Sequence, residues 1–377
     1  MRLDLSSIPI VDDHCHPLMK MPSPSQGTAY RALFTQSIDP GMAEFHLEQG
    51  LFYRRAMREL SRLLSCQPNT EEILARRAEL TLEEFIKTLV EDGAIETCLV
   101  DYGYPREGSY SQEEMRQLFP CRLEAILRLE PLIEELIQSS QSFDELLCAF
   151  DDALGDVRAR GAVAVKSVIA YVSGLAIAPT TPEEAGEAFL ATKSEVQPKG
   201  RRRLIPKPLA DFLVIRGMEH ACRQDVPFQL HTGFGSAGID LFRSNPFLLS
   251  PLLGSDKAKI GKLVLLHAGY PHVREASFMT GLYQNLYLDF SMMVPYLSAN
   301  APQLLREILS YAPASKVLYG SDATSIPEIH WIAAKIGREA LGQALGDMVE
   351  NGELTEGEAH HFAQLMLREN ANRLYDL

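Results

Sequence analysis

Eight short apolar runs recur along this chain of 377 residues, with stretches of helical periodicity between them. Their composition is that of buried strands, and they occupy residues 8–14, 96–102, 122–130, 162–168, 226–231, 262–268, 286–291 and 316–322. Because neighbouring parallel strands must be joined by a crossover, alternating strands and helices favour a parallel sheet. Eight such units predict an α/β fold, the (β/α)8 TIM barrel, with an open doubly wound sheet as the competing fold.

Two connections are longer than a simple crossover requires. The first contains helical stretches such as FYRRAMRELSRLL, and the second contains EEAGEAFLATKSEV. We therefore predict a single barrel domain over residues 1–377, with helical insertions at about 17–90 and 171–207. In such a barrel both insertions leave the carboxyl ends of strands, the face on which active sites lie, so each is suited to wall or cover a site.

The charge and the cysteines limit the partners and the compartment that we expect. With 36 basic and 50 acidic residues the formal net charge is -14, which argues against nucleic acid or an anionic membrane as a partner. The six cysteines form no CxxC pair, and no run approaches the roughly 20 apolar residues of a membrane span. We expect a cytoplasmic protein with reduced thiols, a small-molecule substrate and, as the default assembly, a homodimer.

Polar residues stand at the ends of most of these apolar runs. The stretch VDDHCHP holds two histidines one residue apart, and residues two apart on a strand point to the same side. The strand-end residues are, in chain order, His14, His16, Lys166, His231, His267 and Asp322. The carboxyl ends of barrel strands converge, and imidazole and carboxylate groups bind borderline divalent metals, so this set predicts a metal site.

Each of these residues has a plainer explanation when it is taken alone. A histidine after an apolar run, such as His231 or His267, is more often a satisfied core residue, and Asp322 could cap a helix. Lys166 could extend to solvent or pair with a carboxylate. The occurrence of the whole set at strand ends favours the metal site, because burying such groups without a partner is costly.

The ordered pattern of HxH, Lys, His, His and Asp resembles the amidohydrolase superfamily of metal-dependent hydrolases. Its details are similar to the amidohydrolase-2 branch, which includes nodulin-like proteins that are sometimes fused to glutamine synthetase. The matching stretches span nearly the whole chain and include VDDHCHP, AVAVKSVIAY, PFQLHTGFG, LVLLHAGYPHVREAS and KVLYGSDA. One departure follows strand four, where relatives often have an arginine and this chain has Val172, so its ligand can differ from theirs.

The resemblance implies that His14, His16 and Asp322 hold a divalent metal, with His231 completing or sharing the site. Zinc is the expected ion, although Mn²⁺, Fe²⁺ or Ni²⁺ would suit the same ligands. Such a metal would polarise a substrate carbonyl and lower the pKa of a bound water molecule. Asp322 would then accept the proton of that water and pass it to the leaving group.

Lys166 and His267 decide whether one metal binds or two. An unmodified lysine would be repelled by the cation and would contact substrate instead, whereas a carboxylated lysine would bridge two metals. In the binuclear case His231 and His267 bind the second metal, and in the mononuclear case His267 stabilises the transition state. The resemblance leaves both open, and we favour two metals with a carboxylated Lys166.

Three further residues are candidates for substrate contacts. Arg128 ends strand three and could clamp a carboxylate, although an interior ion pair is equally expected. Tyr171 follows strand four, where simple packing competes, and Arg55 lies on a helix whose default is a solvated face. The remaining histidines are assigned to turns, the surface or helix packing: His46, His220, His272, His330, His360 and His361.

The leading functional hypothesis is a hydrolase that uses a metal-activated water molecule to cleave an amide, ester or lactone bond of a small substrate. The alternative is a metal-dependent non-oxidative decarboxylase of a small aromatic carboxylic acid. A binding or scaffold role comes third, and the intact ligand set argues against it. The substrate itself is not specified, because specificity in this fold lies in the loops.

Overall fold

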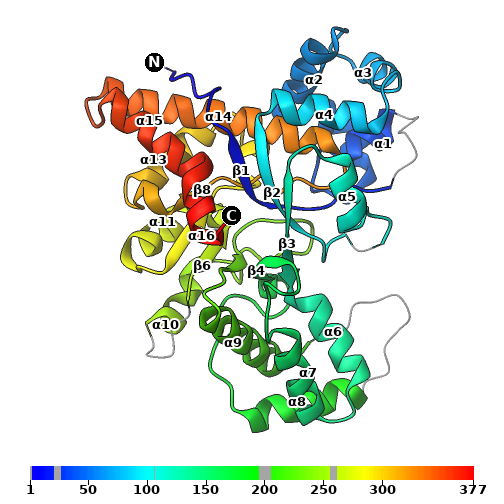
Figure 1. Cartoon of the computed structure of the whole chain (residues 1–377), viewed down its shortest axis with the longest axis vertical. Coiled ribbons are helices and arrows are strands. Elements are labelled where there is room, and N and C mark those ends of the chain that lie inside the picture. The colour runs from blue at the N-terminus through cyan, green and yellow to red at the C-terminus, as the bar shows by residue number, and fades with distance from the viewer. Residues whose placement is uncertain (1, 21–26, 106, 195–204, 255–260) are drawn as a thin grey trace. The chain divides into compact units, whose positions relative to one another are not determined.

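The eight strands form one sheet in which neighbours follow chain order from β1 to β8. The computed structural model describes residues 2–20, 27–105, 107–194, 205–254 and 261–377. The strands are β1 (Ile10–Cys15), β2 (Ile95–Asp101), β3 (Arg122–Arg128), β4 (Ala162–Ser167), β5 (Phe228–His231), β6 (Leu263–Leu266), β7 (Leu286–Asp289) and β8 (Val317–Leu318) (Figure 1). The pair β1–β2 and the successive pairs from β3 to β7 are parallel. A doubly wound sheet would reverse its strand order at a switch point, so the predicted (β/α)8 barrel is confirmed.

Seven of the eight strands are shorter than the apolar runs that predicted them, and β2 has the same length as its run. β3 ends at Arg128 because helix α6 begins at Leu129, and β8 spans only Val317–Leu318. β6 ends at Leu266, and His267 opens the 3-10 turn η6 (His267–Gly269) with a positive φ of 67°. An apolar run indicates which residues are buried, not which residues pair in a sheet. Most of the runs are longer than the strands because the chain stays buried after its last hydrogen bond to a neighbouring strand.

Residues 233–238 read GFGSAG, which is the glycine spacing of a dinucleotide-binding turn. Such a turn opens directly into a helix, whereas the next helical segment after β5 is the 3-10 turn η4 (Pro246–Leu249). Gly233 has a φ of 68°, and a Cβ there would lie 2.3 Å from the carbonyl carbon of Gly269. We attribute this glycine to close backbone packing rather than to phosphate binding.

The chain forms two compact units. Unit 1 comprises residues 1–124, 235–237 and 289–373, and unit 2 comprises residues 125–234, 238–288 and 374–377. The organisation as a single domain remains a prediction. No helix within the described residues is both long enough and apolar enough to cross a membrane.

Unit 1 contains the predicted insertion after β1. Its helices are α1 (Gly27–Ala32), α2 (Leu51–Leu64), α3 (Thr70–Arg77) and α4 (Leu82–Asp92), drawn in blue to cyan in Figure 1. α4 begins with a capping box, in which Thr81 and Glu84 each bind the backbone N–H of the other. The other helices of this unit are α5 (Gln112–Leu118), α12 (Met293–Tyr296), α13 (Ala301–Leu309), α14 (Pro327–Glu350), α15 (Glu356–Gln364) and most of α16 (Asn370–Tyr375).

Helix α14 is the main buried helix of unit 1. Trp331 on this helix is fully buried, and its indole N–H donates to Asp92 Oδ2 of α4 at 2.7 Å. Lys335, one turn further along, donates to the same oxygen at 2.9 Å. These contacts fix α14 against α4, so the insertion after β1 is joined to the core of its unit.

Unit 2 contains α6 (Leu129–Ser139), α7 (Phe143–Ala153), α8 (Pro182–Ser194), α9 (Lys207–Arg223), α10 (Ser250–Leu253) and α11 (Val273–Leu282). α8 belongs to the predicted insertion after β4, and α9 begins at its end. Residues 195–204 of that insertion lie outside the described residues. The aromatic side chains Phe150, Phe189 and Phe228 are buried in the core of this unit.

Replacing Asp151 with asparagine is expected to destabilise the protein at pH 7, by an amount that becomes smaller as the pH falls below 3.8. The Arg216 guanidinium, and after it His220, hold the pKa of the Asp151 carboxyl below its usual value of 3.8. A lowered pKa in the folded state adds stability above pH 3.8, and that stability is lost as the pH falls through the folded value. We expect a loss of about 0.5–1 kcal/mol at pH 7, because the pair is partly exposed.

Urea unfolding of Asp151→Asn and wild type at pH 7 and at pH 3 measures this difference. The matched control is Asp152→Asn, because Asp152 is an exposed neighbour on the same helix. An equal loss of stability at pH 7 and pH 3 would show that the ion pair is not the cause.

Candidate metal centre

The two histidines of VDDHCHP lie together at the carboxyl end of β1. His14 is inside the strand and His16 follows it by one residue. Their rings are in edge contact, with centroids 5.0 Å apart, and both side chains are buried. Cys15 lies between them and donates from Sγ to the carbonyl of Leu99 at 3.4 Å. The alternation of a strand therefore places both imidazoles on one side, as the sequence predicts.

Asp322 comes from the loop that follows β8. Its backbone has a φ of 52°, a left-handed conformation that aspartate tolerates better than most residues. Its N–H donates to the carbonyl of His14 at 2.9 Å, which holds this loop against β1. Residues 14 and 322 are therefore in contact although they are at opposite ends of the chain.

Three potential metal ligands meet at this point. Asp322 Oδ1 lies 3.4 Å from His14 Nε2 and 3.2 Å from His16 Nε2. A tetrahedral zinc ion with bonds of about 2.0–2.1 Å to nitrogen and oxygen needs ligand atoms about 3.3 Å apart. The donor set and its spacing thus fit a divalent cation with little rearrangement.

The protonation of His16 supports the same conclusion. Its Nδ1 lies 3.3 Å from the backbone carbonyl of Asp101, and a carbonyl oxygen can only accept, so Nδ1 carries the proton. In a neutral imidazole Nε2 then presents a lone pair, and it faces the carboxylate of Asp322 at 3.2 Å. With Nδ1 as the donor, Nε2 and the carboxylate can bind the same cation. A backbone carbonyl behind a ligating histidine is also the usual support of a metal site.

A second pair of predicted site residues lies in unit 2. His231 Nδ1 and His267 Nε2 form a hydrogen bond of 3.0 Å, and both side chains are buried. The Tyr171 ring lies 4.7 Å from the His231 ring, centroid to centroid, so Tyr171 lines this pair. Lys166 is 1 % exposed and is the register partner of Gln229, two positions before His231 on β5.

The two arginines predicted to contact substrate have other neighbours. Arg128 is the register partner of Lys166 on the adjacent strand, and its charge acts on the buried Glu130 carboxyl. Arg55 pairs with Glu339 at 2.6 Å and donates to the hydroxyl of Ser298 at 3.3 Å. A contact of either arginine with substrate remains a prediction.

Four buried residues of unit 1 form a group that the sequence did not predict: Asp12, Cys15, Cys98 and His330. Cys15 lies between His14 and His16 in the sequence. Burial raises the pKa of the Asp12 carboxyl to about 7, although two hydrogen bonds from Ser321 oppose the shift. Burial also lowers the pKa of His330 to about 3, so this imidazole is neutral. In the sequence, His330 is one of six histidines outside the strand ends, and no local pattern connects it to the two cysteines.

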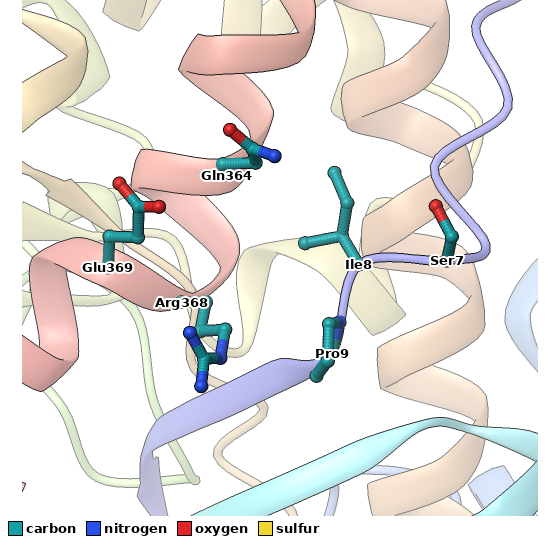
Figure 2. A pocket seen from close by; sticks show the side chains of 6 residues that line it. All are labelled: Ser7, Ile8, Pro9, Gln364, Arg368 and Glu369. Carbon is teal, nitrogen blue, oxygen red and sulfur yellow. The ribbon is translucent and has the colours of Figure 1, made fainter.

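A separate hollow of about 280 Å³ opens near the start of β1 (Figure 2). It is lined by Ser7, Ile8, Pro9, Gln364, Arg368 and Glu369. Arg368 also binds Glu96 through two hydrogen bonds of 2.6 and 2.9 Å. The hollow lies at the amino end of the strand, opposite to the end that carries the histidines, so we do not assign chemistry to it.

Known proteins resemble the chain in sequence and in structure. The sequence profile of the amidohydrolase family matches residues 156–377. Protein fluG of Emericella nidulans is 28% identical over 98% of the chain, and the chain spans 46% of that protein. The chain therefore has about half the length of this curated relative.

Two solved structures resemble the fold over nearly its full length. A candidate metal-dependent hydrolase from Lactobacillus casei superposes with a TM-score of 0.88 at 25% identity, covering 100% of this chain and 98% of the other. A uronate isomerase from Thermotoga maritima superposes with a TM-score of 0.69 at 13% identity, covering 98% and 95% of the two chains. At so low an identity the second likeness shows the fold alone.

Proposed function

Because the chain belongs to the amidohydrolase family, we propose that it is a metal-dependent hydrolase of a small substrate with an amide, ester or lactone bond. The observation that carries the proposal is the position of the Asp322 carboxylate, within 3.4 Å of the Nε2 atoms of both His14 and His16. These three residues would hold a divalent cation, with zinc as the expected ion.

Three protein ligands leave coordination positions open, which is the arrangement of catalytic rather than structural zinc sites. A cation bound there supplies Lewis acidity, which activates water and polarises a carbonyl group. The Asp101 carbonyl keeps the proton of His16 on Nδ1, so its Nε2 stays available as a ligand. Asp322 is the only carboxylate among the three, so it is the residue suited to take a proton from the attacking water and return it to the leaving group.

The hydrogen-bonded pair in unit 2 extends the proposal. His231 and His267 share a proton across 3.0 Å, so at least one of the two bonded nitrogens carries a lone pair. As a ligand, His231 would bind a metal ion, and His267 would bind a second metal or stabilise the transition state. Both roles, the carboxylation of Lys166, a cytoplasmic location and a homodimer remain predictions from the sequence.

The test is a substrate screen with the metal-loaded protein. Amides, esters, lactones and aromatic carboxylic acids are incubated with the protein, and the products are identified by mass spectrometry. Hydrolysis incorporates one oxygen from labelled water, whereas a decarboxylase releases CO₂ without incorporating it. Turnover that incorporates labelled oxygen supports the hydrolase, and release of CO₂ alone would replace it with the decarboxylase.

Replacing Lys166 with methionine is expected to lower the metal content by about one ion per chain, because the bridging ligand is lost. Elemental analysis of both proteins, purified with bicarbonate and without chelator, measures the difference. Methionine keeps the length of this buried side chain without its charge. The matched control is Lys262→Met, because Lys262 pairs with Asp225 in the same unit. An unchanged metal content in Lys166→Met would return Lys166 to a substrate role.

A further inference from the structure

We propose that unit 1 holds a second kind of metal site, a structural zinc site formed by four buried side chains: Asp12, Cys15, Cys98 and His330. It shares no ligand with the His14–His16–Asp322 centre, so it can be tested independently of the proposed hydrolase.

The ligand types are those of a closed zinc site. Two thiolates, one imidazole and one carboxylate make a complete tetrahedral set and leave no position for water, as in structural rather than catalytic sites. The ligand atoms lie within 4.8 Å of one another. Zinc bonds of about 2.0–2.3 Å need ligand atoms about 3.3–3.8 Å apart, so a contraction of about 1 Å closes the site.

An irregularity in the sheet brings the ligands together. Residues three apart on a regular strand point to opposite faces, so Asp12 and Cys15 should be separated. Asp12 is the register partner of Cys98, and the register of β1 with β2 shifts between Asp12 and Cys15, so that Cys15 pairs with Val100. The shift places one carboxylate and two sulfurs on a common side.

His330 provides an independent sign that a ligand belongs in this group. Its side chain on α14 is 2 % exposed, and neither ring nitrogen has a hydrogen-bond partner in the described structure. The Phe119 ring packs edge-on against it, with the ring centroids 5.7 Å apart. Buried polar atoms are nearly always hydrogen-bonded, so an imidazole with two unsatisfied nitrogens indicates a missing partner. A cation bound to one nitrogen would supply it.

The acidic groups in the site favour a dication as that partner. Asp12, Cys15 and Cys98 are at most 1 % exposed, so their ligand atoms can surround a cation without contact with solvent. Zinc displaces the protons of its thiol ligands.

Hydrogen bonds already hold the Asp12 carboxylate in one orientation, in which it could bind a zinc ion. Its Oδ1 accepts the N–H groups of Ser321 at 2.8 Å and of His14 at 3.4 Å, and its Oδ2 accepts the Ser321 hydroxyl at 2.5 Å. Each carboxylate oxygen has two lone pairs, so Oδ2 keeps one for a metal. A zinc ion there would brace β1, β2 and α14, and it would stiffen the strand that carries the two histidines.

Cobalt substitution of the full chain tests the proposal. The protein is stripped with chelator, reduced and titrated with Co²⁺ alone, because thiolate-bound cobalt gives an intense near-ultraviolet charge-transfer absorption that histidine and carboxylate ligands do not give. We expect this absorption in the wild type and in the His14→Ala/His16→Ala double variant. Cys98→Ser should lose much of it. Cys121→Ser should retain it, because Cys121 contacts Cys98 but is not one of the four ligands.

The double variant separates the two proposals, because it lacks the catalytic ligands and retains the thiolates. If Cys98→Ser does not fold, His330→Gln replaces it, with an expected loss of cobalt affinity of at least about 10-fold. A wild-type spectrum without thiolate absorption, at saturating cobalt and with six free thiols, would overturn the proposal. Absorption that persists unchanged in Cys98→Ser, or unchanged cobalt affinity in His330→Gln, would do the same.

Discussion

Replacing His16 with alanine is expected to remove about one metal ion per chain and to lower turnover by at least about 100-fold. His16 directs Nε2 at Asp322 Oδ1, 3.2 Å away, and its other nitrogen is held by the Asp101 carbonyl. Without this imidazole only His14 and Asp322 remain in the group, which are too few ligands for a zinc site. Elemental analysis of dialysed protein measures the first effect, and initial rates on a substrate from the screen measure the second.

The matched control is His361→Ala, because His361 is an exposed histidine on α15. It should keep the metal content and the turnover of the wild type, so any general effect of losing an imidazole is accounted for. The thiolate absorption of cobalt-loaded protein should survive in His16→Ala, since the four proposed structural ligands are intact. A His16→Ala protein with full metal content and full turnover would rule out the proposed catalytic centre.

Replacing Gly320 with alanine is expected to destabilise unit 1 by about 2–4 kcal/mol. A Cβ at this position would lie 2.3 Å from Asp289 Oδ2 and 2.7 Å from Asp13 Oδ1, and both carboxylates belong to buried residues. Neither neighbour can move away freely, so the backbone must shift. Asp322 is two residues further along, and a displacement of about 1 Å at a catalytic group can cost about 100-fold in rate. Denaturant unfolding and metal content measure the two effects.

Gly357→Ala is the matched control for the same chemical change. Gly357 lies in α15, and a Cβ there meets nothing within 4 Å. Alanine is favoured over glycine in a helix, so this variant should be unchanged or more stable by roughly 0.5–1 kcal/mol. The two variants are thus expected to differ in sign. Equal stabilities for them would show that the space at Gly320 is not restrictive.

The three proposed ligands could be named from the sequence because each stands at the end of an apolar run. His14 and His16 follow a buried strand at the spacing that places them on one side, and Asp322 follows another. The Asp101 carbonyl that orients His16 could not be predicted in the same way, because every residue has a carbonyl and only the pairing of β1 with β2 selects this one. The hydrogen bond between His231 and His267 likewise depends on the register of β5 with β6.

The group of Asp12, Cys15, Cys98 and His330 could not be predicted either. In a regular strand, residues three apart point to opposite faces, so the sequence of β1 alone would place Asp12 and Cys15 on different faces. The register shift that unites them arises from pairing with β2, about 85 residues further along, and it leaves no local mark in the sequence. His330 is in a long helix, where a histidine by itself indicates no partner.

The sequence by itself determined the fold class and the order of the ligands, because the period of apolar residues and the polar residues that end each run are local properties of the chain. Tertiary structure decided which of those atoms meet. The left-handed backbone at Asp322 and its N–H bond to His14 set the position of the carboxylate, and both depend on contacts across some 300 residues. Contacts of that range are fixed only when the strands pair, since pairing sets register, and register sets which side chains share a face.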